Sequence, residues 1–515
     1  MRKTIAALIC SINSIAVSAQ ADTLPRFIKD SFDVYVTRAM KEWQVPGLSI
    51  CVVKNGKAVV LKGYGVREHG TTDAVDENTP FMIGSNTKAF TGTALAMLDA
   101  ESKHAGNKGK FSLDDKVQKW LPGFRLYDPW VAKETNIRDL LCHRMGFETF
   151  QGDFMYFDSD LSSQQVYERF AKVKPMYSFR SKWGYTNAAF GIAGEVLHKA
   201  SGKTWAAFIT DRIFKPLGMD NSLALSNDIK KASNKATAHT VVMGELKKIP
   251  YGNIDNLAPA GSISSSAKDM SRWVMALLNN GTLDGKEIIP RSALQQTWLP
   301  HSILGNGCTQ FNRGHFSLYG LGWFMEVYEG RKIISHTGGV NGFVTSVTLI
   351  PEEQLGIVVL TNTDYNGLFQ VLNWEIRDAF LGLPYRNYQQ VAISYSKSTE
   401  EKTEKEVALK NDTLQMKLPA SLPLLDYTGT YRHPVYGLMQ IRLQHEGLVA
   451  TFEHHKGRYA SLGALGGNRF YAVFNDPLYG RKVWPFTTKN GKVHSVTVTV
   501  ADFVEFTPYE FIKIK

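Results

Sequence analysis

Cysteine is scarce in this chain, which argues against a fold held together by disulfide bonds. The 515 residues include four cysteines: Cys10, Cys51, Cys142 and Cys308. Disulfide-stabilised secreted domains carry a denser and usually even-numbered set. Removal of an N-terminal segment with Cys10 would leave an odd number. Stability is therefore expected from hydrophobic cores, for which an apolar content of 43% is ample.

Long hydrophobic runs are also absent. The most apolar stretch, 5–17, is interrupted by polar residues and is shorter than the roughly 20 residues that cross a bilayer. Two basic residues precede it and Ala19-Gln20-Ala21 follows, the three-part pattern of a secretory signal peptide. We therefore expect residues 1–21 to be a signal peptide and the protein to be periplasmic or secreted, without stable membrane insertion. Lipid attachment at Cys10 is a weaker alternative, because Ile9 is bulky.

No block of lysine and arginine concentrates the positive charge. The formal net charge is +11 and the pI is about 9.2, but the basic residues are scattered along the chain. Nucleic-acid-binding proteins concentrate such charge on one face or along one helix. Diffuse charge is typical of a solvated surface, so we expect no nucleic-acid partner.

The middle of the chain contains both strand and helix patterns. Asn55-Gly56 between two β-branched runs predicts a hairpin. Apolar residues at helical spacing predict a helix that begins just after Gly84, residues 111–250 are rich in helical patterns, and 330–362 return to strands. We expect an α+β fold over 22–387, with an antiparallel sheet flanked by helices and interrupted by a helical insertion.

A change in composition predicts a domain boundary. A chain of 515 residues is expected to form two or three domains. Residues 388–418 contain a charged run that forms either a solvated helix or a linker, and we interpret it as a charged linker. Beyond it, short aromatic and β-branched segments predict a small antiparallel β-barrel or sandwich over 419–515.

The stretch FMIGSNTKAF, 81–90, contains Ser85 and Lys88 at the start of the predicted helix. A helix N-terminus stabilises developing negative charge on a serine, and a lysine three residues later lies within reach of the hydroxyl. Apolar neighbours would lower the lysine pKa and leave the amine neutral, as a base must be. The pair is therefore a candidate nucleophile and base.

Two further motifs contain polar groups suited to catalysis. WGYTNAAFG includes Tyr185, whose hydroxyl can relay protons, and Asn187, whose amide can orient a lysine and a substrate. The second motif lies on a predicted edge strand and consists of His336, Thr337, Gly338 and Gly339.

Spacing alone does not single out these residues. Ser-x-x-Lys recurs at Ser265–Lys268 and at Ser394–Lys397, and Tyr-x-Asn recurs at Tyr251–Asn253 and at Tyr385–Asn387. An ordinary surface pair explains any one of them equally well. The order of the motifs is the stronger signal.

In that order, over about 250 residues, the motifs resemble the signature set of the serine β-lactamase and penicillin-binding superfamily. The chain is similar to the class C branch, with its D,D-carboxypeptidase, D-aminopeptidase and esterase relatives. Stretches such as IRDLLCHRMGF and PAGSISSSAKDMSRWVMALL extend the resemblance over residues 30–385. The strand-rich C-terminal part resembles the lipocalin-like domain often appended to such hydrolases.

The resemblance implies acyl transfer without a metal or cofactor. Ser85 would attack a carbonyl carbon, and Lys88 and Tyr185 would carry its proton to the leaving group. Asn187 would position the substrate, and the backbone N–H groups of Ser85 and Gly339 would form the oxyanion hole. The implied substrate is a small peptide, amide or ester, with D-amino-acid or peptidoglycan-derived peptides as one option. The oligomeric state is not indicated.

The chain departs from the family pattern at two places. His336 stands where class C β-lactamases have a lysine that attracts the carboxylate of the antibiotic, and an imidazole is mostly neutral at pH 7. Efficient β-lactam hydrolysis is therefore not expected, and position 336 is expected to govern substrate choice. Arg144 and Met145 replace small polar residues in a loop at the border of the site.

Two other functions stay open: β-lactam hydrolysis, and a catalytically weak protein that binds penicillin or cell-wall fragments. A metal-dependent function is not expected, because the adjacent His454 and His455 lack the spacing of metal ligands. We expect these two side chains on the surface of the barrel.

Overall fold

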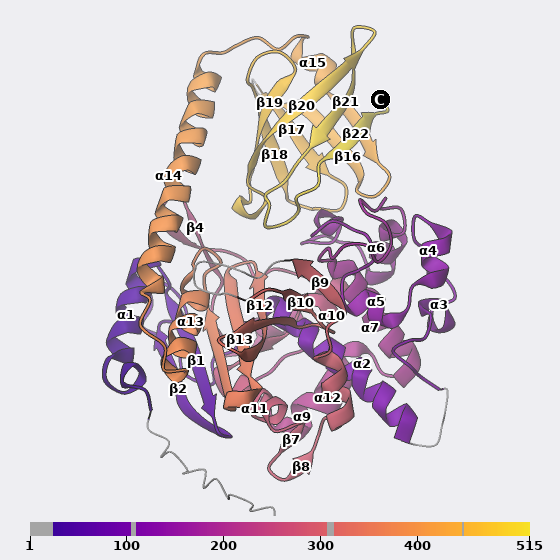
Figure 1. The fold of residues 1–515 in the computed structure, drawn as a ribbon. Coiled ribbons are helices and arrows are strands. Elements are labelled where there is room, and N and C mark those ends of the chain that lie inside the picture. Colours follow the sequence, from indigo (N-terminus) through magenta and orange to yellow (C-terminus); the bar gives the residue numbers. More distant parts are fainter. Residues whose placement is uncertain (1–23, 105–109, 306–313, 445–446) are drawn as a thin grey trace, which may run out of the picture.

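The computed structural model describes residues 24–104, 110–305, 314–444 and 447–515. The expected signal peptide at 1–21 and Cys308 lie outside the described residues. Figure 1 shows a large part built of a sheet and helices and, above it, a β-barrel, with the long helix α14 (Tyr388–Gln415) running between them. Within the described ranges, no helix is both long and apolar enough to cross a membrane.

An antiparallel sheet is the centre of the large part. In the portion of the chain that the structure describes, eight strands follow the order β2-β1-β14-β13-β12-β11-β10-β9. Their bounds are β1 Gly47–Lys54, β2 Lys57–Gly65, β9 Ser302–Gly305, β10 Ser317–Tyr319, β11 Phe324–Tyr328, β12 Arg331–Val340, β13 Phe343–Ile350 and β14 Leu355–Thr361. Strands from early and late in the chain thus form one sheet, as the sequence predicts.

Helices surround this sheet, and many come from the insertion between β3 (Phe81–Met82) and β6 (Ser264–Ser265). The helix bounds are α1 Phe32–Glu42, α2 Thr87–His104, α3 Val117–Trp120, α4 Pro129–Glu134, α5 Ile137–Leu141, α6 Ser163–Phe170, α7 Asn187–Ser201, α8 Trp205–Ile209, α9 Lys215–Leu217, α10 Ala258–Gly261, α11 Ala267–Leu278, α12 Arg291–Thr297 and α13 Leu368–Phe380. Two short hairpins accompany them, β4 (His239–Val242) with β5 (Glu245–Lys248), and β7 (Thr282–Leu283) with β8 (Lys286–Glu287). The α+β architecture with a helical insertion is confirmed.

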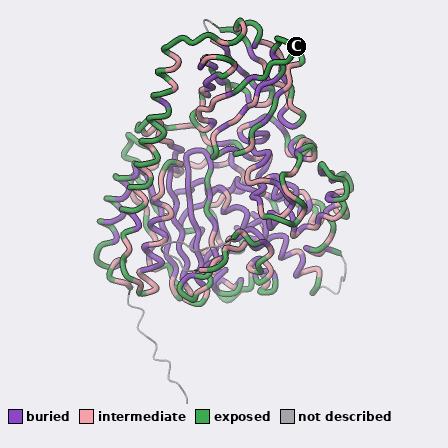
Figure 2. Tube along the Cα trace, turned by 45° about the horizontal axis from the view of Figure 1, so that its top comes forward, coloured by how far each residue is buried: buried purple, intermediate pink, exposed green. Residues whose placement is uncertain are grey.

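Both faces of the sheet are buried because side chains alternate along each strand. On β1, Leu48 and Ile50 join a core formed with α1 and α13, whereas Cys51 and Val53 join the larger core that contains α2 and α11. Figure 2 shows the buried residues concentrated in the sheet and the helices around it. Cys51 and Cys142 are free and buried within these cores.

The charged run beyond residue 387 forms a continuous helix, α14, of 28 residues. Its buried residues are Tyr388, Gln389 and Val407, and the rest of its surface is mainly exposed (Figure 2). Of the two conformations that the composition allowed, the solvated helix is the one adopted.

The C-terminal part is a closed antiparallel barrel. Within the described residues its eight strands are β15 Gly429–His433, β16 Gly437–Gln444, β17 Gly447–Phe452, β18 Tyr459–Ala464, β19 Arg469–Phe474, β20 Arg481–Lys489, β21 Lys492–Val498 and β22 Tyr509–Lys513. The short helix α15 (Leu424–Tyr427) precedes them. Pairing of β22 with β15 closes the barrel, so neither has a free edge.

The prediction that His336 lies on an edge strand is wrong, because β12, which contains it, lies between β11 and β13. The pairing with β11, however, runs from Arg331 to Ser335, where it meets Phe324 at the start of β11. From His336 to Val340 the described partner is β13 alone. This half of an internal strand therefore has one open side.

Candidate active site

Three segments far apart in the sequence meet at the N-terminal end of α2: η2 (Gly84–Asn86), the start of α7 and the second half of β12. The first, η2, is a single 3₁₀ turn that leads from β3 into α2. Gly84 has a φ of +52°, and a Cβ atom there would lie 2.8 Å from the backbone nitrogen of Gly339 on β12. A Cβ on Gly338 would lie 1.8 Å from the Ile83 carbonyl oxygen. Glycine at both positions lets η2 and β12 touch backbone to backbone.

Lys88 is the second residue of α2 and is completely buried. Its Nζ donates hydrogen bonds to Ser85 Oγ at 3.1 Å, to Asn187 Oδ1 at 2.6 Å and to the Ala260 carbonyl oxygen at 2.7 Å. Burial lowers the pKa of Lys88 to about 7, against the charge of Asp153, which raises it. A substantial fraction of this amine is therefore neutral near pH 7.

Tyr185 completes a triangle with Ser85 and Lys88. Its hydroxyl is hydrogen-bonded to Ser85, and its ring centre lies 4.7 Å from Lys88 Nζ. Burial raises the pKa of Tyr185 well above its ordinary value, while the bond to Ser85 lowers it. Ser85, by contrast, is partly exposed. The hydroxyl that could attack is the one that solvent and substrate can reach.

Asn187 is the first residue of α7 and connects Lys88 to a buried carboxyl group. Its Nδ2 donates to Asp153 Oδ2 at 2.6 Å, while its Oδ1 accepts from Lys88. Burial raises the pKa of Asp153 to about 8, which hydrogen bonds from Asn187 and Tyr156 oppose. Sequence reasoning missed Asp153, since the residues around it form no recognisable motif.

His143, also missed, supports the segment that carries Tyr185. Its Nδ1 accepts a hydrogen bond from the Thr186 backbone N–H at 3.0 Å, and its ring centre lies 4.4 Å from that of Tyr185. Burial lowers the pKa of His143 well below its ordinary value, so the ring is neutral and can accept this bond. It comes from the LLCHRMGF loop, which the sequence placed at the border of the site.

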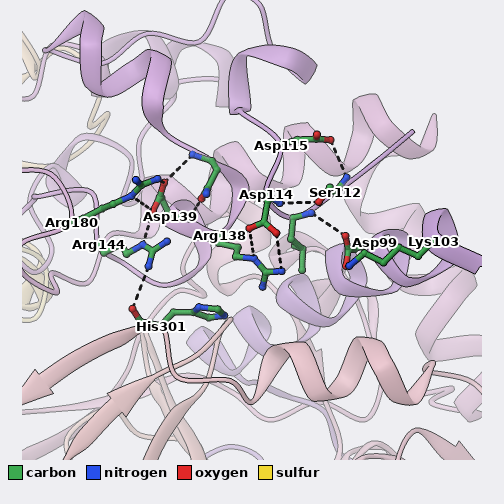
Figure 3. Close-up of polar contacts among 12 residues, drawn as sticks. Asp99, Lys103, Ser112, Asp114, Asp115, Arg138, Asp139, Arg144, Arg180 and His301 are labelled. Atoms are coloured by element: carbon green, nitrogen blue, oxygen red, sulfur yellow. Dashed lines mark hydrogen bonds and ion pairs between the residues drawn. The ribbon is translucent and has the colours of Figure 1, made fainter. Parts of the chain in front are cut away.

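The two unusual residues of that loop have structural partners. Arg144 Nε lies 2.6 Å from Asp139 Oδ1, and Arg180 contacts the same carboxylate at 2.7 Å. Figure 3 shows both guanidinium groups reaching Asp139. Met145 is buried, with 2% of its surface exposed. Arg144 is thus held in an ion-pair cluster.

His336 is buried and neutral. Burial lowers its pKa to about 3, and the nearby charge of Lys88 acts in the same direction. Nδ1 donates to the Thr337 carbonyl oxygen at 2.6 Å, which leaves Nε2 to accept from the Tyr319 hydroxyl at 3.0 Å. With 1% of its surface exposed, it provides no positive charge for a substrate carboxylate. Thr337, its neighbour on the strand, is exposed.

The backbone of Gly339 points its polar groups to the open side of β12. Val340 pairs with Phe343 across a two-residue turn, so this pair exchanges both hydrogen bonds. Hydrogen-bonded pairs alternate along an antiparallel ladder, which gives Gly338 the next such pair and turns the N–H of Gly339 away from β13. That N–H lies beside η2, whose second residue is Ser85.

The other Ser-x-x-Lys and Tyr-x-Asn pairs of the sequence have different partners from those of Ser85, Lys88 and Tyr185. Ser265 is buried and shares a hydrogen bond with Ser222, whereas Lys268 donates to Asn78. The Tyr251 hydroxyl donates to a backbone carbonyl group, and that of Tyr385 lies at an exposed site. Ser394 and Lys397 lie on α14. Ser85 and Lys88 are the pair that is joined to the Tyr-x-Asn and His-Thr-Gly motifs.

The expectation that His454 and His455 lie on the barrel surface is wrong. His455 is 3% exposed, stacks on Phe154 with ring centres 4.4 Å apart, and its Nε2 donates to the Phe154 carbonyl oxygen at 2.8 Å. His454 contacts Asp160 at 2.8 Å. Both join the barrel to the helical insertion. Among the described residues, no group of three or more His, Cys, Asp or Glu side chains is placed to hold a metal ion.

Comparison with protein families gives two matches. Residues 32–381 match a model described as Beta-lactamase, and residues 415–512 match one described as Domain of unknown function (DUF3471). The first match contains Ser85, Lys88, Tyr185, Asn187 and the 336–339 segment. The second contains the barrel.

Relatives in sequence include hydrolases of fungal origin. The unguisins hydrolase ungD' of Aspergillus campestris is 26% identical over 431 residues, which cover 80% of this chain and 78% of that protein. Protein flp of Staphylococcus aureus is 26% identical over 344 residues, covering 65% of this chain and 63% of that protein.

Two solved structures share the fold. The octameric penicillin-binding protein homologue from Pyrococcus abyssi has a TM-score of 0.56 at 19% identity, covering 93% of this chain and 99% of that chain. A D-stereospecific amidohydrolase from Streptomyces sp. has a TM-score of 0.53 at 21% identity, covering 68% of this chain and 99% of that chain. At these identities the likeness concerns the fold.

Proposed function

The chain belongs to the beta-lactamase family, and we propose that it is a serine hydrolase that forms an acyl-enzyme on Ser85 with small amides, peptides or esters. The observation that carries this proposal is the environment of Lys88. A completely buried amine with a pKa lowered to about 7 donates a hydrogen bond to a partly exposed serine hydroxyl. Such an amine is poised to take the proton of the nucleophile near neutral pH.

In the proposed acylation step, one proton moves from Ser85 to the leaving group. Ser85 Oγ bonds to the carbonyl carbon as its proton passes to Lys88. The bond from that carbon to the leaving nitrogen or oxygen then breaks, and the proton travels through the Tyr185 hydroxyl to the leaving group. A water molecule next attacks the acyl-enzyme, gives one proton back to Ser85 along the same path, and releases the acid.

The negative oxygen of the intermediate needs two donors. The backbone N–H groups of Ser85 and Gly339 are the proposed pair, since η2 contacts β12 beside Gly339 and the Gly339 N–H faces the open side of the strand. Removal of one such donor typically costs about 10² to 10³ in rate.

The state of His336 favours amides and esters over β-lactams. A buried neutral imidazole, with its pKa lowered to about 3, offers no attraction to the carboxylate of a β-lactam antibiotic. One fold neighbour is a D-stereospecific amidohydrolase and one relative an unguisins hydrolase, which supports D-amino-acid amides or peptides as the first substrates to test.

The proposal is tested with a fluorophosphonate probe and three substrates. Wild-type protein should be labelled, Ser85→Ala should not, and Ser265→Ala, with the same Ser-x-x-Lys spacing, should be labelled normally. A D-amino-acid amide or a short-chain ester should be hydrolysed faster than a chromogenic cephalosporin. Fast cephalosporin turnover with the amide and ester untouched would identify a β-lactamase instead. Absence of labelling at any pH would favour the cell-wall-binding alternative.

A further inference from the structure

A loop of the barrel, residues 499–508, leaves the ladder between β21 and β22 and reaches the proposed active site. Its attachment is buried: Val504 and Glu505 are each 1% exposed. The Glu505 carboxylate accepts the backbone N–H groups of Gly152 at 2.5 Å and Phe154 at 3.0 Å. These two residues flank Asp153, the partner of Asn187. The loop is therefore anchored directly behind the site.

The two aromatic residues beside this anchor stay half exposed. Phe503 is 40% exposed and Phe506 is 50% exposed, although Val504 and Glu505 between them are buried. Since Val504 and Glu505 already attach the loop, the two rings are not needed in the interface to hold it. Half-exposed aromatic rings held on a fixed loop offer large apolar contact areas with little loss of side-chain entropy.

Phe503 lies over the strand that contributes Gly339. Two of its ring carbons lie 3.2 and 3.5 Å from the position that a Cβ atom on Gly339 would take. Its ring also meets the edge of Phe157, with ring centres 6.4 Å apart. Phe503 thus bridges the open side of β12 and the helical insertion.

Phe506 reaches the site from the Tyr185 side. Its ring stacks on Phe150 with centres 5.6 Å apart, and Phe150 in turn meets the Tyr185 ring edge to face at 5.6 Å. Tyr185 is hydrogen-bonded to Ser85. Phe503 therefore lies beside Gly339, and Phe506 is linked through Phe150 to Tyr185. Both rings thus adjoin residues that surround Ser85.

We propose that Phe503 and Phe506 are specificity-determining residues, which the barrel supplies to bind an apolar or aromatic group next to the scissile carbonyl. This inference rests on the proposed nucleophilic role of Ser85. The substrate class narrows to acyl donors with an apolar side chain, and the barrel becomes part of the substrate site.

The test compares two esters that share a leaving group, p-nitrophenyl phenylacetate and p-nitrophenyl acetate. Wild-type protein should prefer the phenylacetate in kcat/KM. Phe503→Ala with Phe506→Ala should lower this preference about tenfold or more, mainly through KM, while kcat/KM for the acetate stays within about threefold. Phe503→Leu, which keeps an apolar side chain, should retain most of the preference.

Tyr459→Ala is the matched control, because Tyr459 is a 43% exposed aromatic residue on β18 of the same barrel. It should leave the preference unchanged. An unchanged preference in the double variant, or an equal loss for both esters, would overturn the inference while Ser85 still reacts with the fluorophosphonate. Failure of the wild type to react with the fluorophosphonate would overturn the proposed function, and this inference with it.

Discussion

Lys88 and Asp153 show how burial alone can bring a base and an acid into the same pH range. The pKa of Lys88 falls to about 7 and that of Asp153 rises to about 8, in each case chiefly because burial disfavours the charged form. Asn187 bonds to both groups, so the protonation of one affects the other. The hydrogen-bonded chain from Ser85 to Asp153 therefore titrates as a unit.

The substitution Asp153→Asn should shift the pH dependence of catalysis towards acid. The ionised form of Asp153 raises the pKa of Lys88. Because the pKa of Asp153 is about 8, this carboxyl is only partly ionised near pH 7, so its removal should lower the Lys88 pKa by a modest amount. Lys88 is neutral, and able to act as a base, above its pKa. The rising limb of kcat/KM should thus begin at lower pH in the variant. Rates with p-nitrophenyl acetate from about pH 5 to about pH 9 measure it.

Asp364→Asn is the control for this shift. Burial also raises the pKa of Asp364, to about 6, but among the described residues this carboxylate accepts hydrogen bonds from Thr240 and the Gly342 backbone and from no residue of the site. The Asp364→Asn variant should keep the wild-type pH dependence of kcat/KM. The assignment of Lys88 as the base would be contradicted if the rising part of the kcat/KM profile did not move in Asp153→Asn. It would also be contradicted if the profile of Asp364→Asn moved as far as that of Asp153→Asn.

At the scale of secondary-structure elements, the features that can be predicted from the sequence are those that a short local pattern encodes. Asn55 and Gly56 adopt φ angles of 51° and 72° in the expected hairpin turn, and Ser85 stands where the helix begins. Asp153 and the burial of His455 could not be predicted in this way. His455 bonds to a residue 301 positions earlier in the chain, and no local pattern encodes such a distant contact.

Gly84→Ala should lower kcat/KM about 100-fold or more. The new Cβ would lie 2.8 Å from the Gly339 nitrogen, so η2 and β12 must separate and the two proposed oxyanion donors diverge. Gly56→Ala is the control: its φ of +72° imposes a similar backbone strain, but no heavy atom lies within 4 Å of its new Cβ. It should stay within about threefold of wild type. Equal losses in the two variants would show strain, not displacement, as the cause.

At the scale of the whole molecule, the barrel clamps the part of the helical insertion that holds Asp153. Glu505 binds Gly152 and Phe154, and the Tyr479 hydroxyl donates to the Phe157 carbonyl oxygen at 3.0 Å. These contacts join two domains through backbone groups that lie beside the site. Catalysis and the docking of the barrel are therefore expected to be linked.

Glu505→Ala should lower both stability and activity. It leaves two buried backbone N–H groups without an acceptor, at a cost of about 1–3 kcal/mol each. The Tm should fall, and kcat/KM should fall with it as Asp153 loses its support. Glu505→Gln keeps an oxygen acceptor and should lose less. Glu510→Ala, which removes an exposed carboxylate bonded to Ser495, should change neither value. Wild-type Tm and activity in Glu505→Ala would contradict the linkage.

The length of helix α14 limits how the barrel can be placed relative to the hydrolase-like domain. Its 28 residues span about 42 Å at 1.5 Å per residue, and each residue turns the helix by about 100°. Insertion or deletion of a single residue would rotate everything beyond it by that angle and carry Phe503 away from Gly339. The number of residues in α14 thus sets the direction in which the barrel faces as well as its distance. A change by whole helical turns would keep this direction but would still move the barrel by about 5.4 Å per turn, so any change in length must be compensated at the barrel contacts if the site is to stay intact.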